Sequence, residues 1–150
     1  MLTVSDGVMA GTREDASGAR LVEAVVAAGF EVVERRVVAD GAREVEDALR
    51  SMVEGFEGLV VTTGGTGFSP RDETPEGTRL VIEREAPGLS EAMRLVNPLG
   101  RLSRGVAGIA GRTIILNTPG SPKGAVECFQ AIADVVPHAL ALLCERPTSH

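Results

Sequence analysis

The stretch that decides the fold is residues 58–76, with the sequence GLVVTTGGTGFSPRDETPE. Its first five residues are mostly apolar and β-branched, a pattern typical of a strand covered on both faces in a parallel sheet. The strand leads into a glycine-rich loop at residues 64–67. Thr74 is then expected to cap a helix with Pro75 and Glu76 in its first turn, because proline loses no hydrogen bond there and a carboxylate suits the positive helix end. The stretch therefore predicts a strand, a loop and a helix in succession.

Strands and helices alternate in the same way on the N-terminal side of this stretch. Apolar residues recur at helical intervals in two places, and a strand-like run precedes each of them. The expected elements are a strand at 2–5, a polar loop at 6–18, a helix at 19–28, a strand at 31–39 and a helix from Val45 to Phe56. Asp15 and Ser17 are candidate caps for the first helix, and Gly29 stands where a left-handed C-terminal cap is common.

The C-terminal side contains a further buried strand between helices. The helix that begins at Thr74 is expected to include residues 80–82 and to end at the sequence APG of residues 86–88. The elements expected after it are a short helix around 89–96, a strand at 112–116 and a helix from about 124 to 143. Ser121 and Pro122 suit the cap and first position of this last helix, and Pro137 is expected to kink it because proline lacks an amide.

The order of these elements predicts an α/β protein. Strands that alternate with helices form a parallel or mixed sheet with helices on both of its faces. A chain of 150 residues can bury one packed core without a metal or a disulfide, and no internal boundary is visible in the sequence. A single domain over residues 1–150 is therefore expected.

Composition argues against several classes of function. The chain carries 15 basic and 21 acidic residues, a net charge of −6, and only 3% aromatic residues, so it offers little of what sequence-independent nucleic-acid binding requires. No apolar run approaches the ~20 residues that cross a bilayer, and the first residues show no export leader. We expect a cytoplasmic protein that binds neither nucleic acid nor membrane, with Cys128 and Cys144 as buried free thiols.

Polar residues follow each of the four predicted strands. Ser5 and Asp6 follow the first strand, Asp40 follows the second, residues 64–72 follow the third and residues 117–123 follow the last. Ligands of open α/β sheets bind at the carboxyl ends of the strands, so these groups are expected to converge on one edge. Two of the segments are glycine-containing loops before helix starts, which offer backbone amides to an anion such as phosphate. Neither has GxxxxGKS/T or GxGxxG spacing, which disfavours a Walker-type NTPase and a standard dinucleotide site.

Asp40 and Asp72 add two carboxylates to this edge. Carboxylate oxygens beside phosphates are a common way to hold Mg²⁺, which bridges the two and keeps several water ligands. His138 and His150 lie far from these loops in the sequence, so we expect neither a Ser-His-Asp arrangement nor a zinc site. Catalysis would then rest on electrostatics and positioning, as expected for transfer at phosphorus.

Each of these features also has a purely structural interpretation. The glycines at 64–67 could form only a tight turn, and Asp40 and Asp72 could act as caps or bind backbone amides. Ser103 and Arg104 could be a solvated loop pair, and Lys123 could be a surface charge. Their joint placement on one predicted edge favours the functional interpretation.

Several longer motifs carry a family resemblance. They are LTVSD at 2–6, Asp40, GGTGFSPRDETPE at 64–76, IEREAPG at 82–88, LSR at 102–104, NTPGSPKG at 117–124 and ECFQ at 127–130. With these motifs the sequence closely resembles the molybdopterin adenylyltransferase family, which includes bacterial MogA and the N-terminal domain of gephyrin. The resemblance covers nearly the whole chain, although residues 89–101 form a shorter segment than in gephyrin-like relatives.

The resemblance implies that the terminal phosphate of molybdopterin attacks the α-phosphorus of Mg-ATP, giving adenylyl-molybdopterin and pyrophosphate. It implies that Asp40 and Asp72 are the catalytic carboxylates and place Mg²⁺ and the triphosphate. The residues implied to bind phosphate through their amides are Gly64, Gly65, Thr66 and Gly67. Ser5 and Asp6 would line the nucleotide side. The pterin side would be shaped by Ser103, Arg104, Asn117, Pro119, Gly120, Ser121 and Lys123.

The resemblance also implies a three-layer α/β/α molybdenum-cofactor biosynthesis fold, a homotrimer, and hand-over of the product to a molybdenum-insertion protein. Two other functions stay open. The chain could bind molybdopterin or assemble without turnover, or it could be an unrelated nucleotide-binding domain with a similar fold. Two carboxylates beside a polyanionic ligand favour the enzyme, since a protein that only binds such a ligand does not need them.

Overall fold

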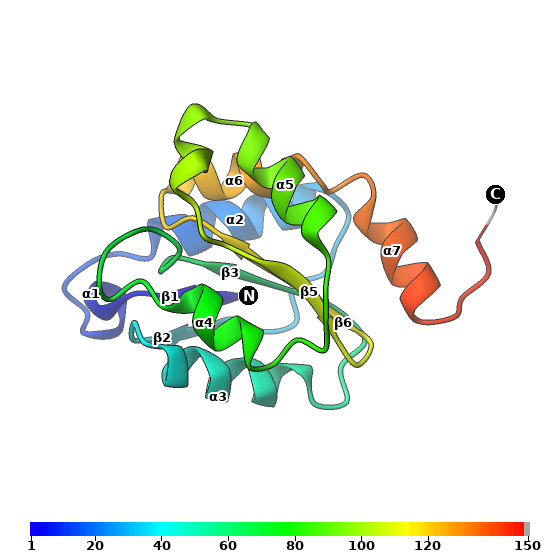
Figure 1. Ribbon diagram of the computed structural model, residues 1–150, viewed down its shortest axis with the longest axis horizontal. Coiled ribbons are helices and arrows are strands. Elements are labelled where there is room, and N and C mark those ends of the chain that lie inside the picture. The colour runs from blue at the N-terminus through cyan, green and yellow to red at the C-terminus, as the bar shows by residue number, and fades with distance from the viewer. Residues whose placement is uncertain (149–150) are drawn as a thin grey trace.

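The computed structural model describes residues 1–148 (Figure 1). Within this range, six strands form one sheet in the order β2-β1-β3-β6-β5-β4. The strands are β1 (Leu2–Val4), β2 (Arg36–Val38), β3 (Gly58–Thr63), β4 (Arg84–Glu85), β5 (Ala107–Ala110) and β6 (Thr113–Thr118). Strands β2, β1, β3 and β6 are parallel, whereas β5 is antiparallel to both β6 and β4. The predicted α/β class with a mostly parallel, mixed sheet is confirmed.

Helices cover both faces of this sheet, which gives the expected three layers (Figure 1). One layer contains α2 (Ala16–Ala27), α5 (Pro87–Leu95) and α6 (Pro122–Gln130), and the other contains α3 (Ala42–Val53) and α4 (Thr74–Arg79). A hydrophobic core lies on each face of the sheet, and neighbouring residues of β3 pack alternately into one core and the other. Val61 packs in the core with Leu21 of α2 and Phe129 of α6, while Val60 packs in the core with Leu49 of α3. Burial on both faces explains the nearly continuous apolar sequence of the strand.

Several predicted helix ends are confirmed at the level of single hydrogen bonds. The Asp15 side chain caps α2 by accepting from the Gly18 amide at 2.9 Å, and the Ser121 side chain caps α6 by accepting from the Gly124 amide at 3.2 Å. Gly29 has a φ of 89°, which is the left-handed conformation expected after α2. Helix α2 starts three residues before the predicted position, so Ser17 lies inside it.

The prediction that Thr74 caps a helix is wrong. Thr74 lies inside α4, whose N-cap is Glu73, and the Thr74 hydroxyl donates to the carbonyl oxygen of Gly64 at 2.9 Å. Helix α4 ends at Arg79. Residues 80–82 were expected to belong to this helix, and they lie outside it. The backbone leaves the helix there because it begins to pair with a strand: the Glu83 amide donates to the carbonyl oxygen of Ile109 at 2.8 Å.

The long C-terminal helix expected between residues 124 and 143 is two helices. Helix α6 ends at Gln130, and α7 (Val136–Leu143) begins after a turn, with Pro137 in its first turn. A proline in a helix interior lacks the amide for the ladder and collides with the preceding turn, whereas it is tolerated in a first turn. Pro137 therefore marks the start of a helix rather than a kink.

Four elements were not expected from the sequence. They are α1 (Asp6–Met9), the 3-10 helix η1 (Pro98–Leu102), β4 and β5. Strand β5 has the sequence AGIA. A side chain at Gly108 would crowd Ile82 and the carbonyl oxygen of Arg84. Close packing therefore explains the small residue at this position better than strand propensity does. Strand β2 covers only part of the predicted residues 31–39, because its partner β1 is itself three residues long.

Candidate functional site

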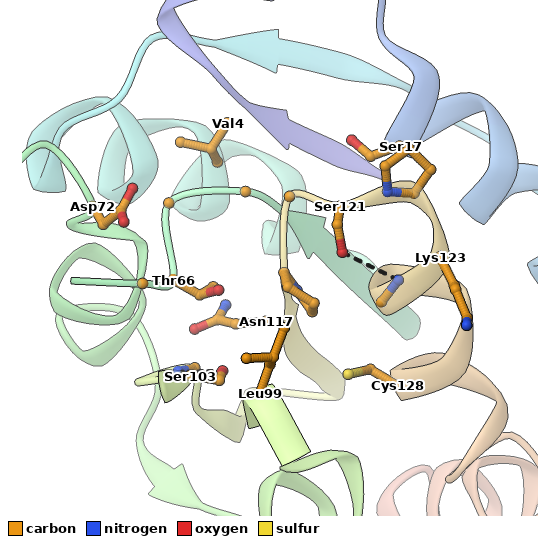
Figure 2. A pocket seen from close by; sticks show the side chains of 18 of the residues that line it. Val4, Ser17, Thr66, Asp72, Leu99, Ser103, Asn117, Ser121, Lys123 and Cys128 are labelled. Carbon is orange, nitrogen blue, oxygen red and sulfur yellow. Dashed lines mark hydrogen bonds between the residues drawn. The ribbon is translucent and has the colours of Figure 1, made fainter. Parts of the chain in front are cut away.

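A cavity of about 1060 Å³ opens at the carboxyl ends of the parallel strands (Figure 2). Most of the predicted site residues line this cavity, whereas Asp6 and Arg104 do not. The predicted residues that line it are Ser5, Asp40, Gly64, Gly65, Thr66, Gly67, Asp72, Ser103, Asn117, Pro119, Gly120, Ser121 and Lys123. Figure 2 shows Asp72 and Thr66 on one side of the cavity and Ser121 and Lys123 on the other. The sheet edge therefore brings the predicted segments together.

The two glycine loops lie against each other at the base of the cavity. Gly64 has a φ of 102°, and a Cβ atom there would overlap the carbonyl oxygen of Val4. A Cβ atom on Gly120 would lie 3.3 Å from the Cα atom of Gly64. The Gly64 amide donates to the carbonyl oxygen of Thr118 at 3.1 Å, which joins the loop after β3 to the loop after β6. Gly64 requires glycine because of its positive φ and its contact with the backbone of Val4, and Gly120 packs closely against it.

The loop after β3 presents unpaired amides. Within the described residues, the amides of Gly65, Thr66 and Gly67 donate no hydrogen bond, whereas the Gly64 amide is used between the loops. Successive backbone amides without partners form a concave site for anions. Three of the four predicted phosphate-binding amides are therefore available, and Gly64 has a structural role.

Asp40 and Asp72 both lie close to this loop, Asp40 near Gly65 and Asp72 near Gly67. Oδ2 of Asp40 accepts from the Asp6 amide at 2.8 Å, and Oδ1 lies 3.3 Å from where a Cβ atom of Gly65 would be. Oδ2 of Asp72 accepts from the Ser69 amide at 3.1 Å. Within the described residues, Oδ1 of each carboxylate accepts no hydrogen bond. Each side chain is thus fixed by one backbone amide and keeps one oxygen for a ligand.

Asp6 supports this arrangement from outside the cavity. Arg71 donates to Oδ2 of Asp6 from Nε and to Oδ1 from Nη2, both at 3.1 Å, and it also donates to the carbonyl oxygen of Asp40 at 2.8 Å. Hydrogen bonds from the Arg71 guanidinium hold the pKa of the Asp6 carboxyl below its ordinary value of 3.8. Arg71 therefore joins the ends of β1 and β2 to the loop that carries Asp72.

Arg104, which does not line the cavity, binds the carbonyl oxygens of the same loop. Its backbone amide donates to the carbonyl oxygen of Thr66 and its Nε to that of Gly67, both at 2.8 Å. Its remaining guanidinium nitrogens bond the carbonyl oxygen of Asp72 and the carboxylate of Glu76. Burial raises the pKa of the Glu76 carboxyl, but the hydrogen bonds from Arg104 and from the backbone of Glu76, together with the charges of Arg104 and Arg79, lower it overall.

Other predicted residues combine cavity lining with structural bonds. The side-chain amide of Asn117 donates to the hydroxyl oxygens of Thr62 and Thr78 at 3.1 and 3.0 Å, and its oxygen accepts from the Val106 amide at 3.2 Å. Ser5 accepts from the Val8 amide at 3.3 Å as the cap of α1. These polar side chains shape the cavity wall, so their structural and functional interpretations are not exclusive.

Sequence analysis missed the part of the cavity wall that comes from α5 and η1. Ser90, Met93 and Arg94 line the cavity from α5, and Leu99 and Leu102 line it from η1. The spacing of the three α5 residues, at i, i+3 and i+4, places them on one helix face and is the signal that could have identified them.

Cys128 also lines the cavity, although it was expected to be buried. Its thiol is half-buried and donates to the carbonyl oxygen of Met93 at 3.4 Å, while Cys144 is buried as predicted. Burial, with a smaller effect from Glu127, raises the pKa of the Cys128 thiol to about 11. The thiol is therefore protonated at neutral pH and is a poor nucleophile.

The remaining predictions concern histidines and membranes. His138 lies in α7, outside the cavity lining, and His150 lies outside the described residues. Across residues 1–148, no helix has the length and apolar character that a membrane span needs.

Comparison with known proteins identifies the family. Residues 1–147 match the family described as "Probable molybdopterin binding domain". The chain is 37% identical over 150 residues to the molybdopterin adenylyltransferase of Helicobacter pylori (strain J99), covering 95% of this chain and 85% of that protein. It is 41% identical to the molybdenum cofactor synthesis protein cinnamon of Drosophila melanogaster, but it spans only 25% of that longer protein.

A solved structure has the same fold. The molybdopterin biosynthesis enzyme MoaB of Thermus thermophilus superposes with a TM-score of 0.90 at 47% identity, covering 99% of this chain and 96% of that one. The sheet order, the glycine loops and the cavity are thus set in a known architecture. The family match over nearly the whole sequence shows that this chain belongs to the molybdopterin-binding domain family.

Proposed function

We propose that this protein is a molybdopterin adenylyltransferase that uses Mg-ATP. An oxygen of the terminal phosphate of molybdopterin forms a bond to the α-phosphorus of ATP, and the bond from that phosphorus to the bridging oxygen of pyrophosphate breaks. The products are adenylyl-molybdopterin and pyrophosphate. The observation that carries the proposal is the placement of Asp40 and Asp72 in one cavity, next to a loop with unpaired amides.

The donor set of the cavity fits Mg²⁺. Within residues 1–148, no group of three or more histidine, cysteine or acidic side chains could hold a metal ion alone. Mg²⁺ is usually bound by one or two carboxylates together with substrate phosphates and several waters, so Asp40 and Asp72 suffice to hold it. The bound ion would neutralise charge on the triphosphate.

Backbone amides supply the second part of the phosphate site. The amides of Gly65, Thr66 and Gly67 would donate to phosphate oxygens, where fixed donors stabilise the charge that develops during transfer. Arg71 and Arg104 fix the two ends of the segment that carries these amides and Asp72. The site is therefore organised before the ligand binds, which lowers the cost of reorganisation during the reaction.

The two substrates would take opposite sides of the loop. Ser5, which lines the cavity, would lie on the nucleotide side, where Asp6 would contribute by holding Asp40. The residues proposed to shape the pterin side are Ser103, Asn117, Pro119, Gly120, Ser121 and Lys123. Arg104, which the resemblance placed on the pterin side, would act through the loop instead of contacting the ligand.

The proposal includes assembly, cellular location and a partner. We propose a cytoplasmic homotrimer that passes its product to a molybdenum-insertion protein. Leu95 is 85% exposed, and an apolar side chain of this size on a surface suits contacts between subunits. Sedimentation velocity would report three times the 15.6 kDa chain mass if the trimer forms.

Pyrophosphate release tests the activity. The protein is incubated with molybdopterin, ATP and Mg²⁺ without oxygen, and pyrophosphate and adenylyl-molybdopterin are measured. Asp72→Asn should reduce the rate at least a hundredfold with an unchanged unfolding midpoint. Asp47→Asn is the matched control, because Asp47 is exposed on α3 outside the cavity lining. Tight molybdopterin binding with no ATP-dependent product in the unaltered protein would favour a binding role over the enzyme.

A further inference from the structure

Arg94 is a cavity residue to which neither the sequence motifs nor the phosphate site gives a role. It follows Ser90 by one helical turn on α5, and both residues line the cavity. Nη1 of Arg94 donates to the carbonyl oxygen of Gly105 at 3.0 Å, and Nη2 approaches the Ser90 hydroxyl oxygen at 3.5 Å. A guanidinium has five N–H donors in a fixed plane, so these two contacts orient the group and leave three donors.

The charge of Arg94 has no acidic partner in the described part of the chain. The ion pairs of residues 1–148 include other arginines, such as Arg71 with Asp6 and Arg104 with Glu76, but not Arg94. The side chain is half-buried, and its neighbour Met93 is only 3% exposed. A partly desolvated cation without a counter-charge is costly, which favours a ligand that completes its hydrogen bonds.

Arg94 lies at the opposite end of the sheet edge from Asp40. Asp40 follows β2, whereas Gly105 precedes β5, and the order β2-β1-β3-β6-β5 separates them by four strand spacings. The Asp40 carboxylate reaches Gly65 after β3, which is two strand spacings from β5, so with strands ~4.8 Å apart the two groups are separated by about 10 Å. One phosphate group cannot reach both ends, so Arg94 meets a different part of the bound molecules from Asp40.

The surroundings of Arg94 favour a flat, largely apolar group with polar atoms on its edge. Met93, Leu99 and Leu102 line the cavity together with Arg94. Apolar side chains cover the faces of a ring system, while a planar guanidinium donates to acceptors on the ring edge. Arginine makes this contact with the adjacent oxygen and nitrogen acceptors of guanine.

We propose that Arg94 recognises the ring edge of the pterin and so contributes to selective binding of molybdopterin in this cavity. A pterin carries a carbonyl oxygen on its ring edge, and a guanidinium can donate to this oxygen. The guanidinium of Arg94 donates to it while Gly105 and Ser90 hold the group in place. This inference rests on molybdopterin being the substrate, as proposed above.

The test compares Arg94→Met and Arg94→Lys with the unaltered protein. Molybdopterin binding is measured without oxygen by the change in pterin fluorescence, and Mg-ATP binding is measured separately by calorimetry. Arg94→Met should weaken molybdopterin binding at least tenfold, and Arg94→Lys at least fivefold because an ammonium lacks the planar pair of donors. Mg-ATP affinity should change less than twofold in both variants. Arg101→Met is the matched control, since Arg101 is exposed at the end of η1 and does not line the cavity.

The outcomes separate this inference from the proposed enzyme activity. If the unaltered protein releases no pyrophosphate but its molybdopterin binding depends on Arg94, the activity is wrong and the inference holds. If the protein turns over and both Arg94 variants bind molybdopterin as tightly as the unaltered protein, the inference is overturned. Equal weakening of molybdopterin and Mg-ATP binding would also overturn it, because Arg94 would then only support the structure. If Arg94→Met does not fold, Arg94→Lys decides, because it keeps the charge and the aliphatic stem.

Discussion

Asp6 and Asp40 exchange hydrogen bonds across the ends of β1 and β2. The Asp6 amide donates to Oδ2 of Asp40 at 2.8 Å, and the Asp40 amide donates to Oδ1 of Asp6 at 3.0 Å. Each acidic side chain is therefore held by the backbone of the other, and Arg71 ties the pair to the loop that carries Asp72. The two carboxylates proposed to hold Mg²⁺ are thus connected through Asp6 and Arg71.

The Asp6–Arg71 contact predicts a pH dependence. Hydrogen bonding to Arg71 lowers the folded-state pKa of Asp6 below 3.8, so this contact stabilises the protein above the unfolded-state pKa. The contribution is lost as the pH falls through the folded-state pKa. An NMR titration of the Asp6 carboxyl carbon should give a midpoint below 3.8, and Arg71→Gln should raise it. A midpoint that is the same in both proteins would contradict the assignment, and Arg101→Gln serves as the control.

Arg104→Met should loosen the loop that carries Asp72. The variant leaves the carbonyl oxygens of Gly67 and Asp72 and the carboxylate of Glu76 without their donor. Since these groups are partly exposed, we expect a loss of about 1–2 kcal/mol in the free energy of unfolding, measured in urea. Amide hydrogen exchange of residues 67–72 should become faster, while exchange in α2 stays the same. Arg20→Met, an exposed change on α2, should alter neither quantity.

Gly64→Ala should destabilise the protein by about 2–4 kcal/mol, because its φ is 102° and the added methyl group would meet the backbone of Val4. Gly88→Ala is the matched control, since a Cβ atom there meets nothing within 4 Å and the residue lies in α5. Alanine in a helix is about 0.5–1 kcal/mol more favourable than glycine, so the control should stabilise. Urea midpoints of the two variants on the same side of the unaltered protein would contradict this account.

Phe129→Ala should cost about 3–5 kcal/mol of unfolding free energy. Phe129 of α6 is fully buried in the core, and its ring contacts that of Phe30 edge to face at a centroid distance of 6.2 Å. Phe68→Ala removes the same ring from a position that is 70% exposed, and we expect a change of at most about 0.5 kcal/mol. Similar unfolding midpoints for the two variants would show that the core has been assigned to the wrong residues.

The sequence predicted the elements whose signals are local. The caps at Asp15 and Ser121 and the strand β3 have residue patterns that depend on a few neighbours, and each is present. The convergence of Asp40, residues 64–72 and residues 117–123 on one edge followed from the rule for parallel strands. These are features that a short window of sequence and the α/β topology determine.

The errors occurred where distant contacts determine the structure. Threonine is a common helix cap, but the hydroxyl of Thr74 donates a hydrogen bond to the carbonyl oxygen of Gly64 instead. This contact joins the loop to the helix, and a short window of sequence does not reveal it. Strands β4 and β5 exist because they pair beside β6, not because Arg84, Glu85 or the AGIA sequence favours a strand. Arg94 was missed as a cavity residue for the same reason, since its orientation depends on a hydrogen bond to the carbonyl oxygen of Gly105 in another segment.

A crystal structure with Mg²⁺ and an ATP analogue that cannot be cleaved between the α- and β-phosphorus atoms tests the central claim most directly. We predict Mg²⁺ about 2.1 Å from a carboxylate oxygen of both Asp40 and Asp72, with phosphate oxygens on the amides of Gly65 to Gly67. A triphosphate bound elsewhere, or a metal ion that contacts neither carboxylate, would contradict the proposed chemistry.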